Sequence, residues 1–342
     1  MIKVARQDEA HAGKNGWPRP VAVLTAVALL LQLPVPQVRA QAESWQAEWP
    51  NTDFSLTAVD LAEIMSGGPS RDGIPSIDDP KFAAVGEVDL PGNEPVLSVQ
   101  VGDNARAYPL RILMWHEIVN DTVGGVPLAI TYCPLCNTGL VFKREIAGRV
   151  LEFGTSGMLR NSDLVMYDRQ TESWWQQFTG TAIVGALTGT RLPPWPSRLE
   201  SVARFAERHP DGFVLVPTDE DLRLYGQNPY FRYDSRNAPY QFFNGELPQG
   251  IAPLARVVRV GDRAWSLDLL RQARRIETDD LVLTWEPGQA SALDETTIAE
   301  SFDVGNVVVQ RKTSEGLVDE IYTVDFAFAF HAFYPDSTIV TE

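Results

Sequence analysis

Thr131-Tyr132-Cys133-Pro134-Leu135-Cys136-Asn137-Thr138-Gly139 contains the only two cysteines of the 342-residue chain. Residues 126–130, just before it, are apolar and predict a strand. Residues 139–146 and 149–153 predict two more strands, and Ala147-Gly148 between them suits a two-residue hairpin turn. We therefore expect the Cys-x-x-Cys pair on a tight loop between strands, where two thiols can bond to each other or share one metal ion.

Further short apolar segments recur along the chain at spacings of roughly 8–12 residues, which predicts several short strands. We expect an α+β fold that is mainly antiparallel β-sheet with a few helices. Residues 97–110 are similar to residues 257–270, because each stretch is expected to form a strand, a Gly-Asp turn, a strand and a helix. This similarity indicates a possible internally duplicated unit.

Pro193-Pro194-Trp195-Pro196 has the composition of a linker. It divides the expected mature chain into a domain at residues 41–192, which carries the cysteines, and a second half at residues 193–342. The second half is rich in predicted strands but contains no cysteine. We therefore expect it to act mainly as a scaffold.

The N-terminus has the pattern of a signal peptide over residues 1–40. Lys14 and Arg19 precede an apolar run at residues 21–33, and Val38-Arg39-Ala40 offers a cleavage site. We expect export to the periplasm or the extracellular space, with an uncleaved anchor helix as the alternative. No later apolar run approaches about 18 residues, so we expect no membrane span after signal removal.

The charge of the chain bears on its partners. Residues 1–40 carry five basic and two acidic side chains, so without them the net charge of −16 becomes −19. A field of that sign repels phosphate backbones and anionic lipids. We therefore expect no nucleic-acid binding, while the sequence identifies no particular protein or small-molecule partner.

A helix is expected from Leu110 to about Asn120, and apolar residues lie on all of its sides. His116 and Glu117 would then be buried polar groups that need hydrogen-bond partners. The connection from this helix to the cysteines is short, so His116 can lie near them. A core histidine bonded to the backbone is the alternative.

Three kinds of function are compatible with these residues. The first is a soft-metal site for copper or zinc, with Cys133, Cys136 and His116 as ligands. The second is thiol–disulfide exchange, although the predicted hairpin provides no helix N-terminus to stabilise a thiolate. The third is a non-catalytic binding module with a structural disulfide, which would use Trp174, Trp175 and the aromatic side chains of residues 225–243. Closing a four-residue loop gives such a disulfide only about 2 kcal/mol of stabilisation.

Three motifs resemble those of a family of exported bacterial proteins that is defined as a domain of unknown function. The resemblance runs from about Asp72 to Asp268 and implies no particular activity. It implies that His116, Cys133, Cys136, Asp168 and Gln176 belong to one constellation, with Asp168 and Gln176 as a possible second shell of the site. The motifs are Trp115-His116-Glu117-Ile118-Val119-Asn120-Asp121, Thr131-Tyr132-Cys133-Pro134-Leu135-Cys136 and Met166-Tyr167-Asp168-Arg169-Gln170-Thr171-Glu172-Ser173-Trp174-Trp175-Gln176.

Overall fold

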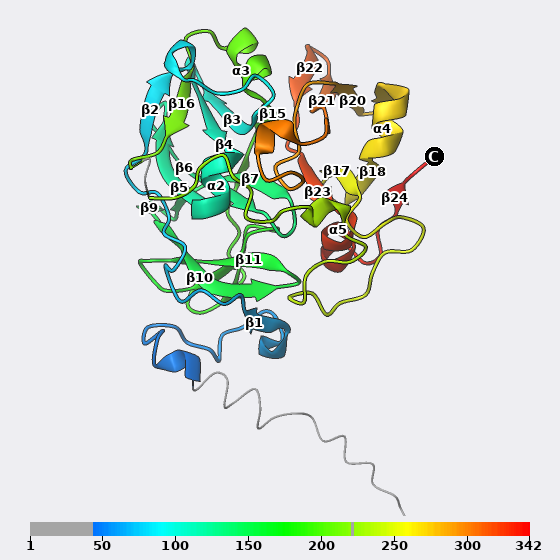
Figure 1. Ribbon diagram of the computed structural model, residues 1–342. Coiled ribbons are helices and arrows are strands. Elements are labelled where there is room, and N and C mark those ends of the chain that lie inside the picture. The colour runs from blue at the N-terminus through cyan, green and yellow to red at the C-terminus, as the bar shows by residue number, and fades with distance from the viewer. Residues whose placement is uncertain (1–43, 220–221) are drawn as a thin grey trace, which may run out of the picture.

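The computed structural model describes residues 44–219 and 222–342 (Figure 1). The predicted signal segment, residues 1–40, lies outside the described residues, so export stays a prediction. No helix within the described residues is long and apolar enough to cross a membrane.

Five small sheets make up the body of the molecule and are arranged as a five-bladed β-propeller. The first has the order β1 (Ile64–Ser66), β10 (Phe153–Arg160), β11 (Asp163–Asp168), β12 (Trp174–Gln176) and β13 (Thr181–Val184). The second has β14 (Pro194–Trp195), β7 (Thr138–Lys143), β6 (Val126–Cys133) and β5 (Ile118–Val123). The third has β15 (Ser197–Ser201), β3 (Pro95–Val101), β4 (Asn104–Pro109), β16 (Phe213–Val216) and β2 (Lys81–Ala84).

The fourth sheet has the order β23 (Thr323–Phe326), β17 (Arg256–Val260), β18 (Arg263–Ser266) and β24 (Ile339–Val340). The fifth has β19 (Arg275–Glu277), β20 (Leu281–Glu286), β21 (Asn306–Thr313) and β22 (Gly316–Asp319). A separate hairpin pairs β8 (Glu145–Ile146) with β9 (Arg149–Val150) through Ala147-Gly148, which confirms the predicted turn.

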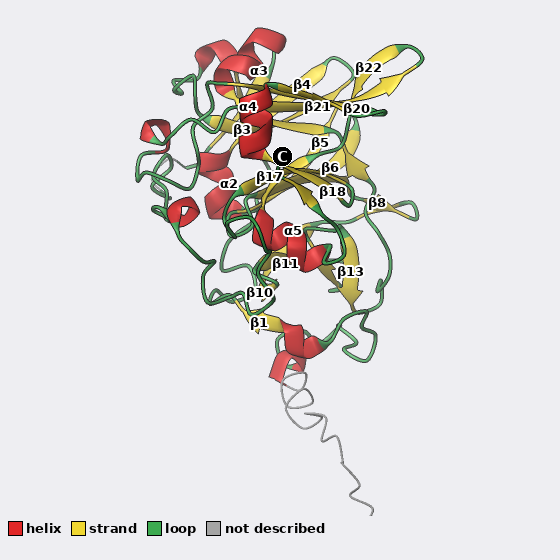
Figure 2. Cartoon of the chain, turned by 90° about the vertical axis from the view of Figure 1, so that its right-hand side faces the viewer, coloured by secondary structure: helices red, strands yellow, loops and turns green. Residues whose placement is uncertain are grey.

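The helices are short, and Figure 2 shows that strands form the centre of the molecule. The α-helices are α2 (Leu110–His116), α3 (Val202–Arg208), α4 (Leu267–Ala273) and α5 (Ala327–Phe333). Single 3₁₀ turns are η1 (Leu61–Glu63), η2 (Val85–Glu87), η3 (Tyr233–Ser235) and η4 (Ile298–Glu300).

The prediction of a generic α+β fold is wrong, because the protein is mostly β and forms a propeller. The reason lies in the strand pairing. β1 pairs with β10, and β14 pairs with β7, so single blades combine segments that are far apart in the sequence. A blade built in this way leaves no regular period in the sequence, and each blade by itself resembles a small antiparallel sheet.

The two similar stretches, residues 97–110 and 257–270, do have the same order of elements. The first forms β3, β4 and the start of α2, and the second forms β17, β18 and the start of α4. Both are therefore the hairpin of one blade followed by a helix that leads to the next sheet. Their similarity reflects equivalent places in two blades of the propeller.

Strands that follow residue 193 complete sheets that begin before it. β15 pairs with β3, and β16 pairs with both β4 and β2. The largest buried apolar cluster likewise contains residues from before and after the Pro193–Pro196 segment. This connectivity makes the two parts of the chain structurally dependent on each other.

Helix α2 ends at His116, four residues earlier than expected. Glu117 has a positive φ of 58°, and its N–H donates to the Leu113 carbonyl at 2.6 Å. Ile118 and Val119 then pair with Thr131 and Ile130 in β6. The apolar residues that made the helix look buried on all sides belong in part to this strand, since β-branched residues favour a sheet.

Candidate metal centre

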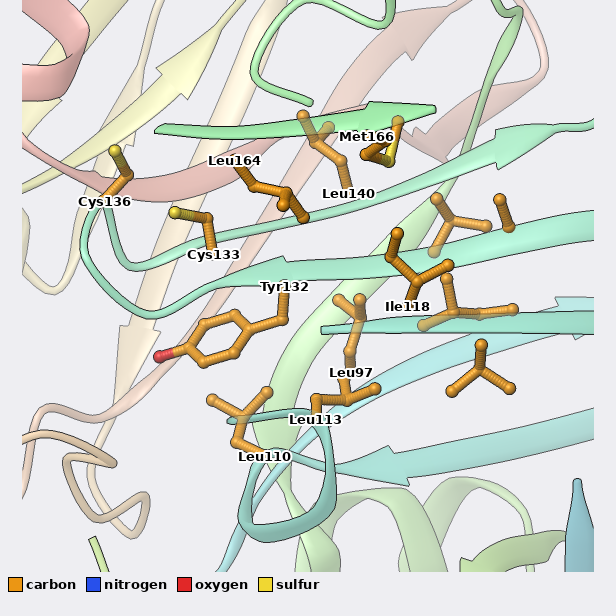
Figure 3. Close-up of a cluster of buried hydrophobic side chains, with 14 of the residues drawn as sticks. Leu97, Leu110, Leu113, Ile118, Tyr132, Cys133, Cys136, Leu140, Leu164 and Met166 are labelled. Atoms are coloured by element: carbon orange, nitrogen blue, oxygen red, sulfur yellow. The ribbon is translucent and has the colours of Figure 1, made fainter. Parts of the chain in front are cut away.

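The Cys-x-x-Cys loop closes the hairpin of β6 and β7, as the sequence predicts. Cys133 is the last residue of β6 and pairs with Thr138, the first residue of β7. Asn137 adopts a left-handed conformation with φ 53°, which asparagine tolerates better than most residues. Figure 3 shows both cysteine side chains at this end of the hairpin, with Leu164 of β11 beside Cys133.

Neighbouring elements hold the loop in place through its backbone. The Phe326 N–H donates to the Cys136 carbonyl at 2.9 Å, and the Tyr233 hydroxyl donates to the Leu135 carbonyl at 3.0 Å. Asn137 donates from Nδ2 to the Val324 carbonyl at 2.8 Å. These bonds come from β23 and from the loop-rich segment around Tyr233, so the geometry of the cysteines depends on tertiary structure.

Asp163 is the acidic residue that lies with the two cysteines. The ligand atoms of Cys133, Cys136 and Asp163 all lie within 4.8 Å of one another, and all three residues are buried. The two cysteines are free thiols. Asp163 begins β11 directly after the β10–β11 turn, so the cluster forms where hairpin ends from two blades meet.

The turn that presents Asp163 has an unusual backbone. Asn161 and Ser162, which are not glycines, have φ values of 54° and 64°. The Cys133 thiol donates to the Ser162 carbonyl at 3.7 Å. Positive-φ residues other than glycine carry backbone strain and cluster at functional sites. Four such residues lie in segments that border the cysteines: Glu117, Asn137, Asn161 and Ser162.

Hydrogen bonds from its neighbours reach only one of the two carboxylate oxygens of Asp163. Its Oδ2 accepts from Gln176 Nε2 at 2.6 Å and from the Phe178 N–H at 2.9 Å. Its Oδ1 is buried without a hydrogen-bond partner, as is the Ser162 hydroxyl. A buried oxygen without a partner is costly, so one carboxylate oxygen remains available for a ligand.

The acid–base properties of the cluster are strongly perturbed. Burial raises the pKa of Asp163 to about 7. Burial, followed by repulsion from Asp163, raises the pKa of Glu117 to about 8. Burial also raises the pKa of both thiols, that of Cys136 well above its ordinary value. Without a cation, burial therefore makes each of these groups harder to ionise than it is in water.

His116 lies outside this cluster of three. Its Nδ1 is 2.7 Å from the Pro75 carbonyl oxygen, and its Nε2 is 2.7 Å from the Tyr225 hydroxyl. Both ring nitrogens thus have hydrogen-bond partners. The structure does not group His116 with the two sulfurs. Repulsion from Asp163 raises the pKa of Glu117, the next residue, and repulsion from Glu117 raises the pKa of Cys133.

The two residues of the predicted second shell lie in different surroundings. Gln176 donates to Asp163 and therefore borders the cluster. Asp168 lies at the other end of β11, where it accepts from Thr171 and from Trp175 Nε1 at 2.9 Å. Trp174 and Trp175 are fully buried in the core, so neither offers an exposed surface to a ligand.

Asp163 was not identified from the sequence. The signal available was an acidic residue at the start of a buried strand, directly after the polar pair Asn161-Ser162. Residues 154–163 contain two glycines and several hydroxyl side chains, a composition that is typical of a polar loop. Most of this segment is instead strand β10, so Asp163 lies opposite the cysteines rather than on an exposed loop.

Comparisons with known proteins place the chain in a family. No curated protein and no solved structure matches it. The model of one family, described as a protein of unknown function (DUF3179), matches residues 71–337, which is well over half of the chain. The chain, with its buried Cys133, Cys136 and Asp163, therefore belongs to the DUF3179 family.

Proposed function

We propose that the protein binds one zinc ion through Cys133, Cys136 and Asp163. The observation that carries this proposal is the convergence of three ligand atoms within 4.8 Å at a buried site. The unpartnered Oδ1 of Asp163 supports it independently, because a bound cation would satisfy that oxygen.

The charges around the site also favour a cation. The groups that raise the pKa of the two thiols after burial include Asp163, Glu117 and Asp325, all of them acidic. A metal ion that replaces the protons of the thiols and of Asp163 would remove this repulsion. Glu117, which acts on both Asp163 and Cys133, is the candidate for a fourth donor.

The donor set favours zinc over copper. Copper(I) prefers soft sulfur ligands, whereas zinc accepts cysteine sulfur and carboxylate oxygen in one tetrahedral site. Two sulfurs and one oxygen are thus a better match for Zn²⁺. Thiol–disulfide exchange ranks second, because the buried thiols have a raised pKa and a thiolate is the reactive form.

The test is metal binding to the purified, reduced protein after removal of bound metal by a chelator. We expect one equivalent of Zn²⁺, measured by competition with a chromophoric chelator, and sulfur-to-cobalt charge-transfer absorption when Co²⁺ takes its place. Cys133→Ser and Cys136→Ser should abolish this absorption. Asp163→Asn should weaken zinc binding by more than about 10–100-fold, the range found for groups that only support the ligands, because Asp163 is a direct ligand in this proposal.

Asp168→Asn is the matched control, because Asp168 is a fully buried aspartate on the same strand but outside the cluster. It should bind one equivalent of zinc with nearly unchanged affinity. Zinc binding that survives in Cys133→Ser would overturn the proposal. Failure to bind zinc or cobalt, together with a reversible disulfide between the two cysteines, would overturn it in favour of thiol–disulfide exchange.

A further inference from the structure

A second cavity, of about 380 Å³, lies outside the cysteine cluster, and its lining comes from strands of three sheets and from the loop between β12 and β13 of a fourth. Leu140 comes from β7, Phe178 follows β12, Arg259 comes from β17 and Arg311 comes from β21. We call it the arginine pocket, because Arg191, Arg259, Arg263 and Arg311 all line it. Its volume falls within the range of small-molecule sites, roughly 300–1,000 Å³.

Arg259 is the most deeply buried of the four arginines. Its side chain is only 8% exposed, and Nε donates to Asp325 at 2.6 Å. Nη2 has no hydrogen-bond partner. The guanidinium carbon lies 4.4 Å from the centre of the Phe178 ring, within the range of a cation–π contact. A buried guanidinium that keeps unused N–H donors is prepared to bind a planar oxyanion.

The other three arginines are more exposed. Arg263 and Arg311 both donate to Asp280, and Arg311 also pairs with Glu320. Arg191 is exposed, and no ion pair links it to another of the described residues. Asp262 and Glu320 line the same cavity and offset part of the positive charge of the arginines. The pocket therefore offers a ligand N–H donors without partners rather than a strong positive potential.

The remaining walls are largely apolar or aromatic. Leu140, Phe142, Phe178 and Tyr334 line the cavity together with the arginines. Such walls bury the body of an organic molecule, while a few polar groups fix its orientation. An inorganic ion would leave this surface unused.

We propose that the arginine pocket binds a small organic oxyanion, with its carboxylate or phosphate group between Arg191 and Arg259 and its apolar body against Phe178 and Tyr334. The proposal does not depend on the zinc site. Two residues link the sites: the Phe178 ring lies in the pocket while its N–H donates to Asp163, and Asp325 pairs with Arg259 while its charge raises the pKa of Cys136.

The test uses benzoate and phenyl phosphate as probes, with benzyl alcohol and benzylammonium as neutral and cationic controls. Binding is followed by calorimetry and by saturation-transfer NMR on the whole protein. We expect one molecule of at least one anionic probe to bind, and neither control compound to compete with it. Tighter binding of benzoate would identify a carboxylate site. Tighter binding of phenyl phosphate would identify a phosphate site.

Arg191→Gln should weaken binding of the preferred anion by about tenfold, since it removes a charge-assisted hydrogen bond. Arg259→Lys keeps a charge beside Asp325 but loses the guanidinium fork, so it should weaken binding by a similar factor. Arg271→Gln, at an exposed arginine on helix α4 that does not line the pocket, is the matched control and should bind normally.

Equal binding of benzyl alcohol and benzoate would overturn the inference, and so would unchanged binding in a folded Arg191→Gln variant. Equal affinity for inorganic phosphate and phenyl phosphate would overturn the part assigned to the aromatic wall. Asp163→Asn separates the two proposals, because it should weaken zinc binding while the anion still binds. Zinc binding and anion binding can thus be tested separately.

Discussion

At the scale of single residues, His116 is a buried imidazole that is fully satisfied in its neutral form. Nδ1–H donates to the Pro75 carbonyl and Nε2 accepts from the Tyr225 hydroxyl, the arrangement that these partners require of a neutral ring. Burial lowers the pKa of His116 below its ordinary value. The Pro75 carbonyl opposes this shift, whereas the charge of Arg223 adds to it.

A lowered pKa in the folded state means that the unfolded chain binds the proton more tightly. The stability that depends on neutral His116 is therefore present above the unfolded pKa, near 6.5, and is lost as the pH falls through the lower folded value. We expect His116→Gln to be less stable than the wild type by about 1–3 kcal/mol at pH 7.5, because buried hydrogen bonds are lost. We also expect the free energy of unfolding of His116→Gln to fall less on acidification than that of the wild type, because the variant has no imidazole to protonate. Urea unfolding between pH 7.5 and 5 measures both effects.

His209→Gln is the control for this experiment. His209 also has a pKa lowered by burial, but it lies at the C-terminal end of helix α3, whereas His116 ends helix α2. This variant should keep the part of the pH dependence that belongs to His116. If the stability of His116→Gln depended on pH in the same way as that of the wild type, His116 would not be the source of the pH dependence.

At the scale of elements, strand β10 contains a bulge between Thr155 and Met158. Gly157 lies in it with a φ of 76°, and a Cβ built there would lie 2.2 Å from the Pro69 carbonyl oxygen. The Ser156 hydroxyl donates to the Val165 carbonyl and accepts from the Met158 N–H. This bulge lies in the strand that leads to the Asn161-Ser162 turn, so it helps to set the position of Asp163.

Gly157 and Gly148 form a matched pair, because both have a φ of 76° but no atom lies near a Cβ built at Gly148. We expect Gly148→Ala to cost about 1 kcal/mol, the penalty for a left-handed alanine. Gly157→Ala should cost about 2–4 kcal/mol, since a clash with fixed backbone is added. Chemical denaturation of both variants gives the comparison. Equal losses would show that the backbone near Pro69 moves aside.

At the scale of the whole molecule, the blades are held together by pairing between distant segments. β16 lies between β4 and β2, and β23 pairs with β17 at one edge of the fourth sheet. Phe178, which follows β12 of the first sheet, stacks on Phe333 of α5 with ring centres 4.4 Å apart. The loss of a strand would therefore expose the edge of the strand that it pairs with in the same blade.

This connectivity predicts that the chain unfolds as one cooperative unit, although it is longer than most single domains. We expect scanning calorimetry to show one transition in which the calorimetric and van't Hoff enthalpies agree. Two resolved transitions would instead support a division near residue 193 into independently folding halves. The measurement requires reversible unfolding, which repeated scans of the same sample establish.

Several features follow from local sequence. The Cys-x-x-Cys loop and the Ala147-Gly148 turn lie where the residue pattern places them, because hairpins are encoded by neighbouring residues. The predicted membership of a family defined as a domain of unknown function agrees with the family match over residues 71–337. The burial of His116 and Glu117 likewise followed from their apolar neighbours.

Other features were decided only by the tertiary structure. The propeller could not be read from the sequence, because its sheets join strands as far apart as β2 and β16, in which Lys81 pairs with Val216, and pairing at that distance leaves no local pattern. Asp163 and the cysteines come from different blades, and the lining of the arginine pocket comes from strands of three sheets and a loop of a fourth. Short-range physical forces fix each hairpin, whereas the sites depend on how the hairpins pack, which the residue pattern of any one segment does not contain.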